Sequence, residues 1–355
     1  MVRALTSRAT GDHPQGSQLW SRRLPWEPTS LSVGVGLIAA AGRRGGVRVL
    51  DLDGGEEHGH VALPGGVTDL AFSPDGRSLA LTGPRGYGLW RAADGRLITR
   101  TTPEACIRPC WTGPGVVAIA QGRRVTTYDT EGVAQWSTTS LPAAATDVAC
   151  AQGGRLLAVS LAGHVRCFMP TRREPIAIHA YSGAPDDLTL STDGRWAVGS
   201  TRQRKTLLWE AHRPSAQPVE CEDGSGQHGP AFSDSGHRLA VPAERHLSLW
   251  SVGPRRPTRL AVLPVCASAV AWRPGDGEML ATAGSDYTIR LWRAGVRSRR
   301  DVYTSLAAWH LTSPGTSLAW IGRRMLVVAE RGGRIALLDI NTAPVPTAWN
   351  DAKAA

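Results

Sequence analysis

The sequence predicts an all-β chain that folds as a β-propeller of eight four-stranded blades. Three observations support this prediction. Short apolar strands alternate with turn residues throughout, and the 355 residues include 40 Gly and 24 Pro. A strand that ends in an aromatic or aliphatic residue recurs at nearly constant spacing. An earlier strand recurs 17 to 20 residues before it in seven of the units.

The clearest unit is residues 266–294, which is predicted to contain three short strands. Alternating residues 268–272 suit the first strand, and the cluster 273–277 is rich in turn residues. Residues 279–283 form a second apolar run. A turn at 284–286 leads to the β-branched and aromatic strand 288–292. A fourth, outer strand would complete the sheet.

The same unit recurs along the whole chain. Its third strand ends successively at Leu50, Trp90, Tyr128, Phe168, Trp209, Trp250, Trp292 and Leu338. The successive differences between these numbers are 40, 38, 40, 41, 41, 42 and 46. A period of about 40–45 residues with four strands per unit is typical of propeller blades. Unit one, residues 31–53, is the most degenerate, so a seven-bladed ring is the alternative.

Unit seven resembles the WD-repeat family, whose repeats end in Trp-Asp or a variant of it. Asp286, six residues before Trp292, stands where that family places a structural aspartate. The resemblance covers about residues 17–341 and implies a rigid platform that holds another protein on a rim. No unit has the family's Gly-His pair in place, and only unit seven has the aspartate. The residues assigned structural roles are Asp286, Trp90, Trp209, Trp250 and Trp292.

Closure of the ring requires one strand from an end of the chain. Seven outer strands are predicted between the eight units, so the eighth must come from outside them. Residues 17–24 are the preferred closing strand, because the C-terminal candidate 342–349 contains two prolines. Residues 1–16 are expected to be a disordered leader, residues 17–349 a single propeller, and residues 350–355 a frayed end.

The composition limits the function classes. The net charge is +10, and 38 of the 40 basic residues are arginine. No apolar run reaches the roughly 18–20 residues of a membrane span, so a cytoplasmic protein without membrane contact is expected. The six cysteines are expected to be free thiols, mostly buried, because a chain of this length needs no disulfide frame.

Basic residues recur in the turns between second and third strands, which share one rim in a propeller. A positive ring around the channel mouth would attract an acidic partner protein, although tight turns are polar in any case. The candidate partner-binding residues are Arg43, Arg44, Arg85, Arg123, Arg124, His164, Arg202, Arg204, Lys205, Arg245, His246, Arg331 and Arg334.

Two other function classes stay open. Nucleic-acid binding would suit the basic charge, but the aromatic residues lie at core positions instead of among the arginines. An enzyme has less support, because no nucleophile elbow or phosphate-binding loop is present, and a small-molecule substrate is therefore not expected. The run Glu56-Glu57-His58-Gly59-His60 resembles a metal site in composition but is expected to be a solvated loop. No catalytic residue, metal or cofactor is assigned.

Overall fold

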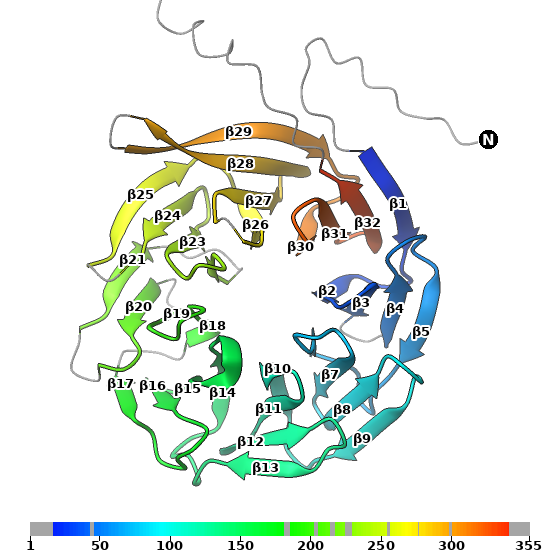
Figure 1. Ribbon diagram of the computed structural model, residues 1–355, viewed down its shortest axis with the longest axis vertical. Coiled ribbons are helices and arrows are strands. Elements are labelled where there is room, and N and C mark those ends of the chain that lie inside the picture. The colour runs from blue at the N-terminus through cyan, green and yellow to red at the C-terminus, as the bar shows by residue number, and fades with distance from the viewer. Residues whose placement is uncertain are drawn as a thin grey trace, which may run out of the picture.

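The chain forms a ring of eight four-stranded antiparallel sheets around one axis (Figure 1). The computed structural model describes residues 17–42, 46–180, 185–201, 205–213, 217–223, 229–253, 256–275, 277–297 and 300–340. The predicted eight-bladed propeller is confirmed. The seven-blade alternative is wrong, because the degenerate first unit forms a complete sheet. The expected leader and frayed end lie outside the described residues, as do residues 341–349.

Each blade runs from an innermost strand at the axis to an outermost strand at the perimeter. Blade 1 contains β2 (Pro28–Val33), β3 (Leu37–Gly42), β4 (Val47–Asp51) and β5 (Glu57–Val61). Blade 2 contains β6 (Asp69–Phe72), β7 (Ser78–Gly83), β8 (Gly86–Arg91) and β9 (Leu97–Thr101). Blade 3 contains β10 (Cys106–Gly113), β11 (Val116–Gln121), β12 (Arg124–Asp129) and β13 (Ala134–Ser137). Blade 4 contains β14 (Ala145–Cys150), β15 (Leu157–Leu161), β16 (His164–Phe168) and β17 (Ala177–Ala180).

The second half of the chain repeats this arrangement. Blade 5 contains β18 (Pro185–Leu190), β19 (Trp196–Thr201), β20 (Lys205–Glu210) and β21 (Val219–Asp223). Blade 6 contains β22 (Ala231–Phe232), β23 (Arg238–Pro242), β24 (Leu247–Ser251) and β25 (Thr258–Leu263). Blade 7 contains β26 (Ala267–Trp272), β27 (Met279–Gly284), β28 (Thr288–Arg297) and β29 (Arg300–His310). Blade 8 contains β30 (Gly315–Ile321), β31 (Met325–Glu330), β32 (Arg334–Asp339) and β1 (Ser17–Arg23).

The N-terminal strand closes the ring, as the sequence predicted. β1 pairs antiparallel with β32 as the outermost strand of blade 8. The indole of Trp20 donates to the carbonyl of Leu52 in blade 1 at 2.8 Å. The backbone amide of Leu24 donates to the carbonyl of Gly333 at 2.7 Å. The closing strand is therefore bonded to the last blade and to the first, which leaves no open end in the ring.

Apolar packing between neighbouring blades holds the ring together. The buried side chains of the described residues fall into eight clusters, and each cluster joins two adjacent blades. Full burial of an aliphatic side chain contributes about 1.5–3 kcal/mol. Trp90, Trp209, Trp250 and Trp292 all lie in these clusters with at most 8% of their surface exposed. Stability therefore depends on contacts that form only when the blades stack.

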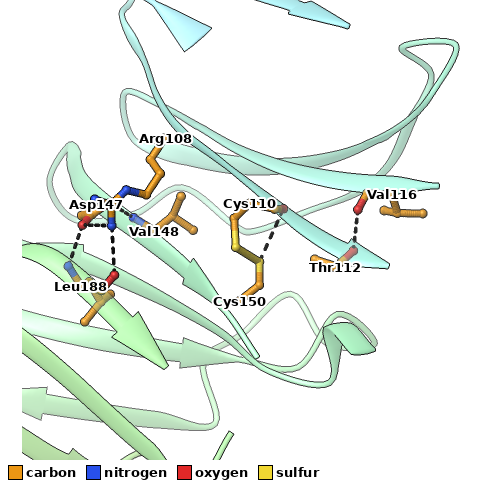
Figure 2. Close-up of a disulfide and its surroundings, with 8 residues drawn as sticks. All are labelled: Arg108, Cys110, Thr112, Val116, Asp147, Val148, Cys150 and Leu188. Carbon is orange, nitrogen blue, oxygen red and sulfur yellow. Dashed lines mark hydrogen bonds and ion pairs between the residues drawn. A yellow bond between two sulfur atoms is a disulfide. The ribbon is translucent and has the colours of Figure 1, made fainter. Parts of the chain in front are cut away.

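A repeated tryptophan contact connects consecutive innermost strands. The indoles of Trp111, Trp272 and Trp320, near the ends of β10, β26 and β30, donate to carbonyls of the preceding innermost strand at 2.9–3.0 Å. Blade 4 has Cys150 at this position and cannot make the contact. A disulfide joins Cys150 to Cys110 in blade 3 instead (Figure 2), with a Cα–Cα distance of 5.9 Å.

The disulfide corrects one expectation from the sequence. Cys110 and Cys150 were expected to be free thiols, and this was wrong for the pair. They are 40 residues apart, which is one blade period, so adjacent innermost strands place them side by side. Cys106, Cys167 and Cys221 are buried, and Cys266 is exposed.

Candidate binding rim

The turns between second and third strands lie on the same face of the ring as the loops that enter the innermost strands. This follows from the antiparallel order of each blade, since a second strand ends on the face where the first begins. We call this face the top rim and the opposite face the bottom rim. The described basic residues among those singled out from the sequence belong to the top rim. Within the described part of the chain, the single helix is the three-residue turn Gln152–Gly154, so no described helix could cross a membrane.

The structure describes nine of the thirteen predicted rim residues. Arg43, Arg44, Arg202 and Arg204 lie outside the described residues. Five arginines are exposed at the top rim, namely Arg85, Arg123, Arg124, Arg245 and Arg331. The remaining four are half-buried: His164, Lys205, His246 and Arg334. Burial lowers the pKa of His164, with help from the nearby charge of Arg166, so His164 is neutral at pH 7.

Several of these side chains are already neutralised by carboxylates. Lys205 pairs with Glu220 at 3.0 Å, and Arg331 pairs with Glu27 at 3.3 Å. Arg334 pairs with the fully buried Glu330, also at 3.3 Å. The positive ring predicted from the sequence is therefore weaker around blades 5 and 8.

Three exposed arginines keep their charge available. No described residue forms an ion pair with Arg85, Arg124 or Arg245, which belong to blades 2, 3 and 6. Arg123 differs, because its Nε donates to the backbone carbonyl of Leu141 at 2.7 Å. This bond fixes the guanidinium at the rim and does not neutralise it. Among the described residues, the basic character of the top rim is thus concentrated in these four arginines.

The turn of blade 7 presents an exposed tyrosine instead of an arginine. Tyr287 has a φ of +62° and 48% of its surface exposed. The carboxylate of Asp286 accepts hydrogen bonds from the amide and hydroxyl of Thr288 and pairs with Arg290 at 3.0 Å. These contacts hold Tyr287 in the left-handed region, which disfavours residues other than glycine by about 1–2 kcal/mol. Asp286 therefore stabilises the turn locally.

Replacement of Tyr287 by glycine is expected to stabilise the propeller by about 0.5–1 kcal/mol. Relief of the left-handed strain outweighs the greater chain entropy of glycine in the unfolded state. Tyr287→Ala is the control, because it removes the ring and keeps the strain. Urea unfolding of both variants checks this expectation. A glycine variant no more stable than the alanine variant would contradict it.

A second group of charged residues lies where the innermost strands begin. Asp69, Arg108, Asp147 and Asp187 come from four consecutive blades, and we call them the axial network. The Arg108 guanidinium contacts Asp69 at 3.3 Å, Asp147 at 3.1 Å and Asp187 at 3.4 Å. It also donates to the carbonyl of Leu188 at 3.1 Å (Figure 2). One arginine thereby bridges the innermost strands of blades 2 to 5.

The backbone of β10 directs Arg108 toward these partners. The pairing of β10 with β11 is interrupted by a bulge between Ile107 and Cys110, and Arg108 has a φ of +21°. Bulges of this kind re-aim a side chain. Arg108 keeps 36% of its side chain exposed, and Asp147 keeps 5%. The network is therefore buried on its Asp147 side and accessible to solvent at Arg108.

Burial raises the pKa of Asp147 to about 6, although Arg108 and the amides of Leu188 and Val148 favour its ionised form. Burial alone would lower the pKa of Arg108, but the carboxylates of Asp147, Asp69 and Asp187 raise it. Arg108 thus stays charged while Asp147 titrates near neutral pH.

The axial network was not predicted from the sequence. A usable signal was present. Asp69, Arg108, Asp147 and Asp187 follow one another at intervals of 39, 39 and 40 residues, which is close to one blade period. Charged residues at one repeat position in consecutive units predict a shared site. No three His, Cys, Asp or Glu side chains among the described residues are placed to hold a metal ion.

Comparisons with known proteins agree with this architecture. Residues 55–95 and 265–293 match the family described as WD domain, G-beta repeat. The crystal structure of the computationally designed Ika8 protein is similar in fold, with a TM-score of 0.72 and 14% sequence identity. The match covers 92% of this chain and 100% of the designed one. No curated protein sequence matches the chain.

Proposed function

Because this chain is a WD-repeat β-propeller, we propose that it is a non-enzymatic scaffold that holds an acidic partner protein on its top rim. WD-repeat propellers generally mediate protein–protein interactions. One observation supports an acidic partner. Arg85, Arg124 and Arg245 are exposed, and no described carboxylate pairs with them. The planar guanidinium binds carboxylates through two parallel hydrogen bonds, which gives such a rim specificity as well as attraction.

The test begins with capture of the partner from a native lysate, after nuclease treatment and at physiological salt. The affinity of the identified partner is then measured for the wild type and for the triple variant Arg85→Glu, Arg124→Glu and Arg245→Glu. We expect the affinity to fall at least about tenfold, since opposite charges are replaced by like charges at the interface.

A matched control reverses three exposed arginines of the bottom rim, namely Arg77, Arg155 and Arg172. Both triple variants change the net charge equally, so long-range attraction alone would weaken them equally. The control should keep its affinity within about twofold of the wild type. Equal losses in the two variants would contradict docking on the top rim.

Nucleic-acid binding is the second candidate, and the net charge of +10 is the observation that favours it. Such binding would disappear with nuclease and would weaken steeply as salt rises. Recovery of nucleic acid alone would replace the acidic-partner proposal.

The cellular compartment of the protein is also part of this proposal. The sequence favours the cytoplasm, whereas the Cys110–Cys150 disulfide weighs against it, since such bonds persist mainly in oxidising compartments. Thiol alkylation of cells before lysis, followed by peptide mass analysis, would show which state occurs in vivo.

A further inference from the structure

A groove beside two of the rim arginines offers a specific position for a partner side chain. The groove has a volume of about 570 Å³ and is lined by residues that include Glu104, Gln121, Arg123, Arg124, Tyr128 and Ser137. We call it the β12 groove. It begins at the top rim, where Arg124 starts β12, and follows that strand toward the bottom rim. None of its lining residues belongs to the axial network.

The strand geometry explains why these side chains meet. Side chains two residues apart on a strand point to the same face, so Arg124, Thr126 and Tyr128 share one face of β12. The ring of Tyr128 packs on Tyr87 of blade 2, with 4.8 Å between the ring centroids. The groove therefore lies on the face of blade 3 that packs against blade 2. An extended segment of a partner could lie along it.

Arg123 and Arg124 place two positive charges at the top-rim end of this groove. Arg123 is anchored through its Nε to the carbonyl of Leu141, and the Leu141 amide donates back to the Arg123 carbonyl at 2.8 Å. Its guanidinium is thus held in place before any ligand arrives. Arg124 is exposed, and no carboxylate among the described residues pairs with it. Gln121 adds neutral hydrogen-bond donors.

One carboxylate of the protein lies in the same groove. Glu104 is exposed and belongs to the loop that enters β10. Its carboxylate lies against Gly122, where a Cβ atom would approach within 1.6 Å of it. The groove therefore holds two positive charges and one negative charge, which leaves a net charge of +1. A single carboxylate neutralises that excess, whereas a phosphate dianion would exceed it.

We infer that the β12 groove binds one aspartate or glutamate side chain of an acidic partner segment, with Arg124 as the main contact. This inference rests on the proposed function and gives it a location. Arg124 would bind the carboxylate through its two terminal nitrogens, and the anchored Arg123 would add a second positive charge. Glu104 would oppose binding by repulsion and so limit the affinity.

The test uses a fluorescein-labelled hexaglutamate peptide and fluorescence polarisation at low salt. Arg124→Gln is expected to weaken binding about tenfold, and Arg124→Lys should recover only part of the loss, because lysine lacks the planar fork. Arg155→Gln is the matched control, since Arg155 is an exposed bottom-rim arginine of the neighbouring blade 4 and lies outside the groove. It should change affinity less than about twofold. Glu104→Gln should strengthen binding a few-fold.

The outcomes separate this inference from the proposed function. Equal losses for Arg124→Gln, Arg85→Gln and Arg245→Gln would overturn the groove as a site and leave a diffuse basic rim. Weaker peptide binding by Glu104→Gln than by the wild type would also overturn the groove as a site. A phosphoserine peptide that binds more than tenfold tighter through Arg124 would contradict the assignment to one carboxylate. Absence of binding to the wild type would count against both proposals.

Discussion

Arg108→Met is expected to lower the free energy of unfolding by about 3 kcal/mol. Removal of one partner of a buried ion pair costs about 3–5 kcal/mol, because it leaves the other charge buried and uncompensated. The lower value applies, since 36% of the Arg108 side chain is exposed. The Asp147 carboxylate is 5% exposed and would lose its counter-charge. Urea unfolding at pH 7 measures the effect.

Two comparisons make this prediction specific. Arg324→Met removes a pair with Asp339 in which the arginine is exposed, and it should cost much less than Arg108→Met because solvent screens exposed charges. Asp147→Asn in the Arg108→Met background should recover part of the lost stability, because it removes the buried charge. A double variant less stable than Arg108→Met would show that Asp147 stabilises the fold without Arg108.

The pH dependence of stability provides a further check on Asp147. Its pKa of about 6 in the folded state lies above its ordinary value, so the folded protein binds more protons between the two values. The contribution of Asp147 is therefore complete below the unfolded pKa and is lost as the pH rises through about 6. The wild type should gain stability relative to Asp147→Asn as the pH falls from about 7 to about 4.

Loss of the Cys110–Cys150 disulfide has the second large expected effect. In the chain-entropy account, a crosslink that closes a loop of this length stabilises by about 4 kcal/mol. The two residues are 40 positions apart. Cys110→Ser with Cys150→Ser should therefore lower the free energy of unfolding by up to about 4 kcal/mol. Blade 4 also lacks the tryptophan contact that blades 3, 7 and 8 make through Trp111, Trp272 and Trp320.

Treatment with a reductant separates the stabilising contribution of the disulfide from the effect of replacing the two cysteine side chains. Dithiothreitol should lower the stability of the wild type to that of the double variant and should leave the variant unchanged. Cys266→Ser is the control, because Cys266 is exposed and free, and its replacement should change stability by less than about 0.5 kcal/mol. A wild type whose stability does not respond to reductant would contradict the expected contribution.

The number and order of the blades could be predicted from the sequence alone. Blades 1 to 7 are each built from four consecutive strands, so their signal is local: a strand ending such as Trp250 or Trp292, preceded by turn residues. The need for a closing strand could also be predicted. Eight units with only seven outer strands between them require one more strand from an end of the chain. The exposure of Arg124 and Arg245 could also be predicted, because tight turns lie at the surface.

Only the tertiary structure decided which charges meet. Arg108 contacts Asp187, which is 79 residues away, because the ring places the start of every innermost strand around one axis. Arg331 is neutralised by Glu27, from a loop at the other end of the chain. Cys110 and Cys150 bond because the curvature of the ring brings two innermost strands together. A repeat period sets which residues are equivalent, but the distances between blades decide which equivalent residues touch.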